Sequence, residues 1–491
     1  MKRTIMTSSV VAAIVTVLAG CCNACRDKDD PAIIEEKVME GVKEIKEAQA
    51  KLSRKAKLSD YAKYAGNVNG TNVWAAALQK AIDENEIVVI PARAEKYYLD
   101  KTVSIPSNRR IEAYGATVRL IDGMNTVMFA SKTALDGTLK PISRDTRGEN
   151  IAILGGRWED NSVKRRGYGG SGKFNTLPRK IGNYYGVSTL FYLGNVDKVT
   201  VRNATFHHTG GFAVQSGDCD AAWFENIYFD RCFADGLHLN GNMSRVYVKG
   251  VRGNVGDDLV ALNAYDWLNS SINFGPQKYV LCEDLELVKT PGARYYPAIR
   301  ILPAIFRFAD GSEIDCAISD VIFRRVKGIV AYKMYLQTPR YEIGGNREWA
   351  KVGSGGNLHF EDLTIENVTP IDGFHSYMTG DPLRGHFGVF EFGANLSTVY
   401  FKNVNLTFDM KKFPTAHLAV VGPKSIVTHS NGKSYEIFDP WVNCTVGKVV
   451  LENITVNGEG PEELVHATEF KDVNKDGQST GKGVIAELAN K

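Results

Sequence analysis

A pattern of alternating apolar and polar residues repeats along this chain at an interval of about 23 residues or more. Copies of it lie at residues 199–206, 222–229, 246–251, 279–285, 358–368, 399–404 and 449–454. Each copy has the length of one strand and breaks at Asn or Gly. Self-similarity at this interval is typical of a solenoid, and alternation with a period of two indicates strands rather than helices. The sequence therefore predicts an all-β solenoid.

The composition agrees with a large folded domain and argues against binding to nucleic acid. Of the 491 residues, 44% are hydrophobic and 47 are glycine, which suits a glycine-punctuated β protein with ample material for a core. The 59 basic and 56 acidic side chains leave a formal net charge of only +3. Because the chain also has no long basic run, we expect no nucleic-acid partner.

Two acidic motifs lie about one repeat apart. Asp235 occurs in Ala-Asp-Gly-Leu-His-Leu, and Asp257 and Asp258 occur in Gly-Asp-Asp-Leu-Val-Ala. If one repeat is one coil, Asp235 and Asp258 lie on adjacent rungs, about 4.8 Å apart along the stack. Converging carboxylates repel one another, so acid/base chemistry explains the cluster better than stability does. A Gly-Asp-Asp turn and a calcium site are the alternatives.

The N-terminus has the features of an export signal. Lys2 and Arg3 precede an apolar run over residues 5–18, which is too short to cross a bilayer as a mature helix. The following Leu-Ala-Gly-Cys resembles a bacterial lipoprotein box, which implies removal of residues 1–20 and lipidation of Cys21. An ordinary signal peptide with an incidental cysteine is the alternative. We expect a cell-envelope protein whose lipid anchors it to a bacterial membrane, facing the periplasm or the cell surface.

The rest of the chain divides into a tether and one domain. Residues 21–58 are charged and helix-forming, so we expect a lipid-anchored tether that is partly helical. Residues 59–491 form the predicted catalytic domain, which we expect to be a monomer. The amphipathic segment over residues 71–82 predicts a helix that caps the open end of the solenoid.

Neither cysteine nor acidic spacing predicts a metal or a cofactor. Five cysteines follow the first 25 residues without a metal-binding spacing, and we expect buried thiols rather than a Cys219–Cys232 bridge. Asp472 opens a segment like a calcium-binding EF-hand loop, but Gly483 takes the twelfth position, where an acidic residue is needed. A turn is the preferred interpretation. We expect no cofactor and no metal ligand.

Two segments near the start of the domain, Val-Val-Ile-Pro-Ala-Arg-Ala-Glu-Lys-Tyr-Tyr-Leu and Ser-Ile-Pro-Ser-Asn-Arg-Arg-Ile-Glu-Ala-Tyr-Gly-Ala-Thr-Val, resemble the opening of right-handed parallel β-helices of the pectate-lyase superfamily. Residues 199–264 resemble glycoside hydrolase family 28, the polygalacturonases, whose motifs are Asn-Thr-Asp, Asp-Asp, Gly-His-Gly and Arg-Ile-Lys. Asp235 stands for the first motif, and Asp257 with Asp258 keeps the second. The third is absent, and Arg300 represents the fourth, with Leu302 where lysine belongs.

The resemblance implies a right-handed β-helix that hydrolyses glycosidic bonds with inversion. Asp257 would be the general acid, while Asp235 and Asp258 hold the attacking water. Arg300 would bind the sugar, and Lys333 would replace the missing lysine, unless it is an ordinary solvated strand residue. Coil spacing alone does not separate inverting from retaining geometry.

Three further side chains are candidates for substrate binding. His208 and His238 flank the aspartates and suit sugar hydroxyls, with ordinary surface histidines as the alternative. Trp267 lies in an excursion after Asp258, where an aromatic ring stacks on a sugar or packs under the loop.

We therefore expect a carbohydrate as the partner and a glycoside hydrolase as the function. The substrate would be a polysaccharide or complex glycan, cut from its end at galactose-type or uronic-acid-type residues. A polysaccharide lyase on the same fold and a non-catalytic glycan-binding lipoprotein are the competing hypotheses.

Overall fold

The computed structural model describes most of the chain after the N-terminus. It covers residues 29–124, 126–133, 147–160, 189–265, 273–307, 311–334, 350–368, 386–422, 427–428, 434–435, 443–472 and 478–491. The expected signal peptide, the lipidation site Cys21 and the candidate sugar platform Trp267 lie outside these residues, as do residues 473–477 of the EF-hand-like segment.

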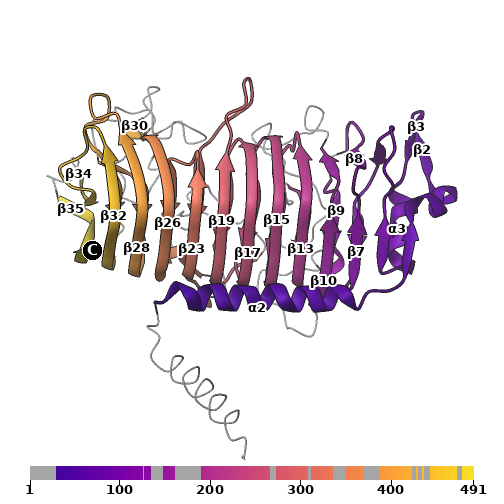
Figure 1. The fold of residues 1–491 in the computed structure, drawn as a ribbon, viewed down its shortest axis with the longest axis horizontal. Coiled ribbons are helices and arrows are strands. Elements are labelled where there is room, and N and C mark those ends of the chain that lie inside the picture. Colours follow the sequence, from indigo (N-terminus) through magenta and orange to yellow (C-terminus); the bar gives the residue numbers. More distant parts are fainter. Residues whose placement is uncertain are drawn as a thin grey trace, which may run out of the picture.

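The chain winds into a right-handed parallel β-helix, in which each coil of the central region adds a long strand to one sheet and a short strand to another (Figure 1). The long strands are β10 (Gly148–Leu154), β13 (Val196–His207), β15 (Cys219–Cys232), β17 (Met243–Val255), β19 (Gln277–Leu287), β23 (Ile318–Lys327), β26 (Ser354–Val368), β28 (Asn395–Phe408), β32 (Cys444–Asn457) and β35 (Gln478–Asn490). The short strands are β6 (Val103–Ile105), β9 (Phe129–Ser131), β12 (Thr189–Gly194), β14 (Phe212–Gly217), β16 (Leu237–Asn240), β18 (Asp258–Asn263), β20 (Ala298–Ile301), β24 (Ala331–Met334), β27 (Phe387–Phe392), β29 (Ala416–Val421) and β33 (Val465–Ala467). Val199 pairs with Ala222 and Ala222 with Val246, so the predicted repeats are the coils.

Smaller elements complete both ends. Towards the N-terminus these are β1 (Lys55–Lys57), η2 (Leu58–Tyr64), β2 (Gly66–Val68), β3 (Thr71–Val73), β4 (Ile87–Val89), β5 (Tyr97–Leu99), β7 (Arg109–Glu112), β8 (Thr117–Leu120) and β11 (Arg157–Glu159). An antiparallel sheet of β21 (Ala304–Arg307), β22 (Glu313–Cys316) and β25 (Ala350–Val352) projects from the coils, and β30 (Val427–Thr428), β31 (Ser434–Tyr435) and β34 (Glu469–Asp472) follow. The expected capping helix is α3 (Ala75–Glu84), which begins later than predicted because Thr71–Val73 is a strand.

The interior of the coil is filled by stacked apolar side chains. Phe323, Phe360 and Phe401 occupy matching positions on three successive rungs, with ring centroids 5.8 Å and 5.5 Å apart. The cysteines Cys219, Cys232, Cys282, Cys316 and Cys444 are buried free thiols, as predicted. A solenoid core of this kind joins each coil only to its neighbours.

Asparagines mark a bend that recurs in the long strands. Asn203, Asn226, Asn403 and Asn453 all have φ between 52° and 56°, in the left-handed region that Asn tolerates better than most residues. Their amides also stack, since Asn226 donates to Asn203 and Asn453 to Asn403, each at 2.8 Å. This backbone requirement explains why the repeats break at Asn.

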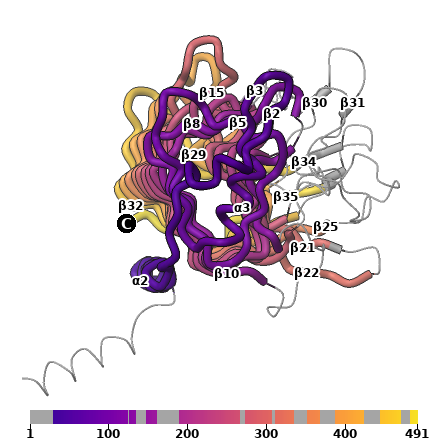
Figure 2. Tube along the Cα trace, turned by 90° about the vertical axis from the view of Figure 1, so that its right-hand side faces the viewer, coloured from indigo at the N-terminus to yellow at the C-terminus, as the bar shows by residue number. Residues whose placement is uncertain are grey.

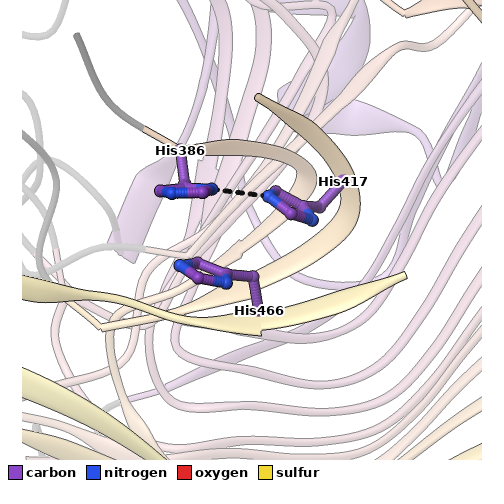
Figure 3. Close-up of side chains that lie close together, drawn as sticks. All are labelled: His386, His417 and His466. Carbon is purple, nitrogen blue, oxygen red and sulfur yellow. Dashed lines mark hydrogen bonds between the residues drawn. The ribbon is translucent and has the colours of Figure 1, made fainter. Parts of the chain in front are cut away.

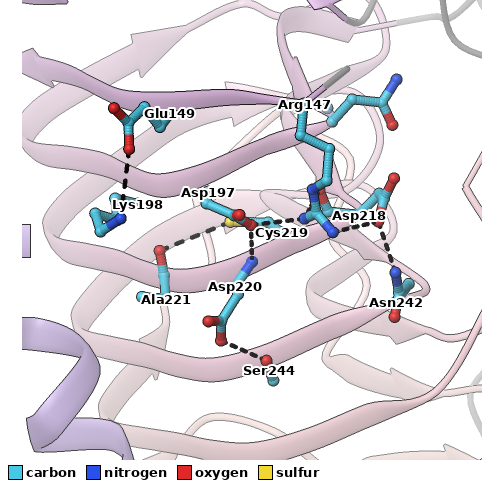
Figure 4. A network of polar contacts seen from close by, with 12 residues as sticks. Arg147, Glu149, Asp197, Lys198, Asp218, Cys219, Asp220, Ala221, Asn242 and Ser244 are labelled. Carbon is cyan, nitrogen blue, oxygen red and sulfur yellow. Dashed lines mark hydrogen bonds and ion pairs between the residues drawn. The ribbon is translucent and has the colours of Figure 1, made fainter. Parts of the chain in front are cut away.

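A polar network supports the turn that leads from the short sheet into the long one (Figure 4). Arg147 bridges Asp197 at 2.7 Å and Asp218 at 3.0 Å. Asp197 in turn accepts from the backbone nitrogen of Asp220, and Asp218 accepts from Asn242 on the next coil at 2.6 Å. These charges are paired across coils, so they fix the relative position of the coils.

Helix α2 (Pro31–Ala50) differs from the expected tether, because it lies across the outer face of the long-strand sheet (Figures 1 and 2). Its buried residues Ile34, Val38, Val42 and Ile45 form one stripe that packs on Ala221, Trp223, Tyr247, Leu281 and Ile322. Glu44 pairs with Arg245 at 2.6 Å and Glu35 with Arg324 at 2.7 Å. The helical part of residues 21–58 is therefore packed on the domain. No helix in the described chain is both long and apolar enough to cross a membrane.

Gly41→Val is expected to weaken this packing. A Cβ at Gly41 would meet the Cβ atoms of Arg245 at 3.1 Å and Ala221 at 3.2 Å, so a larger side chain must push the helix away. We expect the free energy of unfolding to fall by about 1–3 kcal/mol, as for overpacked cores, measured by urea denaturation. Lys43→Val, at an exposed position of the same helix, is the control, and equal stability of the two variants would contradict the docking.

Candidate active site

Asp235 and Asp258 lie on adjacent rungs, as the sequence predicted. Leu237 pairs with Val260 between β16 and β18, which sets Asp235 beside Asp258. The backbone nitrogen of Asp258 donates to Asp235 Oδ1 at 3.2 Å. With Asp257, one carboxylate oxygen from each of the three residues lies within 4.8 Å of the others. The three acidic residues therefore form one cluster.

The cluster is buried. Asp235, Asp257 and Asp258 are only 1%, 4% and 0% exposed. Asp258 is the first residue of β18 rather than part of a turn. Burying three carboxylates is costly unless each has a partner or a proton, so the surrounding side chains decide the charge of each.

Two buried cations face these carboxylates. Arg300 on β20 lies 3.2 Å from Asp257 through Nη2 and 2.8 Å from Asp258 through Nε. Lys333 on β24 lies 3.0 Å from Asp258 Oδ1 and donates to the hydroxyl of Tyr296 at 3.0 Å. Lys333 is 3% exposed, so its interpretation as a solvated strand residue is wrong. Arg300 pairs with Lys333 between the two strands, which places both charges on the same face.

The three carboxyl groups differ in how readily they hold a proton. Burial, together with the neighbouring Asp258 and Asp235, raises the pKa of Asp257 to about 7 against the opposing charge of Arg300. Burial would also raise the pKa of Asp258, but Arg300 and Lys333 outweigh it, so this pKa lies below its ordinary value. Burial raises the pKa of Asp235, opposed by His238. Near neutral pH, Asp257 is partly protonated and Asp258 is ionised.

His238 supports Asp235, which differs from the sugar-binding role expected for it. Its Nδ1 shares a hydrogen bond of 2.6 Å with Asp235 Oδ2. The ring stacks on Phe212, with centroids 3.8 Å apart and planes inclined by 8°, and it is 1% exposed. A ring held on one face and bonded at one nitrogen fixes the carboxylate that it touches. We interpret His238 as a positioning residue.

His208 is not joined to the aspartates by any contact found among the described residues. Its ring stacks on His207 at 4.0 Å, and His207 bonds to Asp230 at 2.7 Å. Tyr265, the aromatic residue near Trp267, is buried against Phe274 and Phe306. It belongs to the hydrophobic core rather than facing a sugar, while substrate binding by His208 and Trp267 stays a prediction.

The cluster suits acid/base chemistry better than a calcium ion. Three carboxylates with oxygens this close are a plausible cation site in isolation. Here, however, Arg300 and Lys333 already contact Asp257 and Asp258. They bring two positive charges to the carboxylates that a metal would need, so a metal ion would face repulsion from both.

Sequence reasoning gave little weight to the contacts of Lys333. The number of residues between β18 and β20 differs from the number between β20 and β24, so no fixed sequence period relates Asp258 to Lys333. The signal that does relate them is alternation, since Lys333 lies between Tyr332 and Met334, which belong to the core.

No protein-family model matches the chain, and no curated protein matches it. Among solved structures, it is similar to an exopolygalacturonase from Thermotoga maritima, with 12% identity, coverage of 91% of this chain and 96% of that one, and a TM-score of 0.48. It is also similar to the catalytic unit of a GH87 alpha-1,3-glucanase from Streptomyces thermodiastaticus, with 13% identity, coverage of 86% of this chain and 70% of that one, and a TM-score of 0.36. A third similar structure is a mannuronan C-5 epimerase module from Azotobacter vinelandii, with 12% identity, coverage of 83% of this chain and 99% of that one, and a TM-score of 0.36. Likenesses this distant decide neither the reaction nor the substrate.

Proposed function

We propose that this protein is a glycoside hydrolase that acts on a polysaccharide or complex glycan. The observation that carries the proposal is that adjacent buried carboxyl groups differ in protonation. Asp257 has a pKa of about 7, whereas two cations hold Asp258 ionised. Neighbouring carboxyl groups whose pKa values are pushed apart are the arrangement that glycoside hydrolysis needs. The polygalacturonase-like motifs in the sequence support the same function.

In the proposed mechanism, Asp257 gives its proton to the oxygen of the leaving sugar as the glycosidic bond breaks. Asp258 and Asp235 hold a water molecule, and Asp258 takes its proton as the water oxygen bonds to the anomeric carbon. Arg300 and Lys333 keep Asp258 ionised. His238 fixes the orientation of Asp235.

The stereochemical course has opposing indications. The family resemblance favours inversion. One oxygen from each carboxylate, however, lies within 4.8 Å of one from each of the others, which is nearer the separation of about 5–5.5 Å in retaining enzymes than that of about 6.5–9.5 Å in inverting ones. We propose inversion, and NMR of the first anomer released tests it. A first product of retained configuration would make Asp258 the nucleophile instead.

The charges of the site argue against plain homogalacturonan as the substrate. The site holds two cations, Arg300 and Lys333, whereas the sequence motifs identified only Arg300. Both cations are buried against Asp257 and Asp258. Little positive charge therefore remains for a substrate carboxylate. We propose a terminal neutral sugar such as galactose, or a uronic acid within a branched glycan, removed one residue at a time.

We therefore expect slow or no cleavage of polygalacturonic acid and faster release of single sugars from branched glycans. The measurement is a screen of the purified protein against plant and host glycans, with products identified by mass. A rapid fall in the viscosity of polygalacturonic acid would contradict both the substrate and the exo-acting mode, without touching the assignment of the aspartates.

The competing functions give different products in the same screen. A lyase would leave an unsaturated uronide that absorbs in the ultraviolet, and it needs a base beside a sugar carboxylate. Arg300, the candidate base, is bonded to two aspartates, which disfavours this reaction. A glycan-binding lipoprotein would bind without releasing any product.

We also propose that lipid at Cys21 anchors the protein to the bacterial envelope, in keeping with its lipoprotein-like N-terminus. Cys21→Ser should move the protein from the membrane fraction to the soluble fraction, because the lipid supplies the anchoring. Specific activity should not change. Cys22→Ser is the matched control and should stay with the membranes. Retention of Cys21→Ser in the membrane fraction would contradict the lipoprotein assignment.

A further inference from the structure

Three histidines far apart in the sequence meet near the C-terminal end of the short-strand sheet (Figure 3). His386 directly precedes β27, His417 is the second residue of β29, and His466 is the second residue of β33. Each comes from a different coil, and one ligand nitrogen from each lies within 4.8 Å of the others. Strands β20 and β24 separate this group from β18, where the acidic cluster lies.

The hydrogen bonds of the group fix the tautomers of His417 and His466, and His417 Nε2 also accepts a hydrogen bond from His386 Nδ1, which a bound metal would displace. His417 Nδ1 lies 2.8 Å from the backbone oxygen of Glu463. A carbonyl only accepts, so Nδ1 carries the proton and Nε2 keeps its lone pair. His466 Nδ1 contacts the carboxylate of the same Glu463, which leaves its Nε2 in the same state. Glu463 thus orients two imidazoles, as carboxylates and carbonyls do behind zinc ligands.

The three rings lie close together but are stacked, with centroids 3.8 Å apart for His386 and His466 and 4.8 Å apart for His417 and His466. His386 Nδ1 lies 2.7 Å from His417 Nε2. Zinc–nitrogen bonds of about 2.0–2.1 Å in a tetrahedral site separate the nitrogens by roughly 3.3 Å. The two nitrogens of His386 and His417 must therefore move apart by about 0.6 Å, and the ring of His466 must turn out of the stack to direct its nitrogen at the same ion.

We propose that His386, His417 and His466 form a binding site for a zinc ion, with Glu463 as the residue that positions two of the ligands. Imidazole nitrogens select zinc and similar transition metals over calcium or magnesium. Three ligands leave one coordination position for water or another ligand. Because the ligands come from three successive coils, the bound ion ties the C-terminal coils together. This site is independent of the proposed hydrolysis.

The test uses the full chain, purified without a polyhistidine tag and stripped of metal with a chelator. Zinc is titrated in competition with a chromophoric chelator, and cobalt serves as a spectroscopic substitute. We expect one zinc per chain, cobalt absorption bands typical of four-coordinate geometry, and a higher melting temperature with zinc. Calcium and magnesium should change none of these.

The variants separate the proposed ligands from a merely structural role. His386→Ala and His466→Ala should each lower zinc affinity about 100-fold, and Glu463→Gln should lower it about tenfold. The exposed positions of His386 and Glu463 make their variants safe for folding. His207→Gln, whose ring contacts Asp230 instead, is the control and should bind as the wild type does. Absence of stoichiometric binding, or unchanged affinity in His386→Ala and Glu463→Gln, would overturn the proposal.

Discussion

Asp257→Asn and Asp258→Asn are each expected to lower kcat by about 10²–10⁴-fold, the contribution typical of a general acid or base. An amide at position 257 has no proton to give to the leaving sugar. An amide at position 258 cannot accept the proton of the water. Asn is nearly isosteric with Asp, but Asp258→Asn leaves Arg300 and Lys333 without this carboxylate, so the folded fraction of each variant is measured beside kcat.

The pH dependence separates the two roles. Asp257 must be protonated to act, so the wild-type rate should fall as the pH rises past its pKa of about 7. Asp258 must be ionised, and because its pKa is lowered, the loss on the acid side should come only well below neutral pH. Asp257→Asn should abolish the alkaline limb of the profile together with most of the rate.

Asp218→Asn is the matched control for these two changes. Asp218 is also buried and paired, with Arg147 and Asn242, but it belongs to the turn network. Its replacement should lower stability and leave kcat near that of the wild type. If Asp257→Asn or Asp258→Asn kept more than about a tenth of the wild-type rate on the true substrate, the assignment of the acid and base would be wrong.

Lys333→Met should shift the acid limb of the pH profile towards neutral pH. Without the ammonium group 3.0 Å away, Asp258 keeps only Arg300 as a cationic partner, so its pKa rises. We expect kcat at the acid end to fall about tenfold for each unit by which that pKa rises. The measurement is the full pH–rate profile on the preferred glycan.

Two further variants test whether charge is the cause. Lys333→Arg restores a cation and should recover much of the acid limb. Lys351→Met removes an exposed lysine that pairs with Glu313 and should leave the profile unchanged. An acid limb that did not move in Lys333→Met would show that Lys333 does not set the charge of Asp258.

The coils and the acidic cluster were predictable because their signals are local and periodic. Alternation fixes which residues of a strand face the core, and one coil relates Asp235 to Asp258. The burial of the cluster was not predictable, since alternation does not say what covers an outward face. Pairing of Asp258 with Lys333 depends on coils of unequal length. The three histidines have no common spacing, so only the folded chain brings them together.

Helix α2 shows a different kind of error. Its charged residues suggested a partly helical tether that does not pack on the domain, although Ile34, Val38, Val42 and Ile45 recur at helical spacing. This apolar stripe is narrow, so the many charged residues of the segment counted for more in the prediction than the helical spacing of its apolar residues did. The packed helix shows that periodicity was the better guide.

Hydrolysis in water enriched in oxygen-18 tests the central claim most directly. A glycan that the purified protein cleaves is digested in this water, and the products are weighed by mass spectrometry. If Asp235 and Asp258 activate water while Asp257 protonates the leaving sugar, each cleavage should add one heavy oxygen to the new reducing end, and Asp258→Asn should slow product formation by about 10²–10⁴-fold. Products without the heavy oxygen and with an unsaturated end would contradict the hydrolase, and so would full labelling by Asp258→Asn at the wild-type rate.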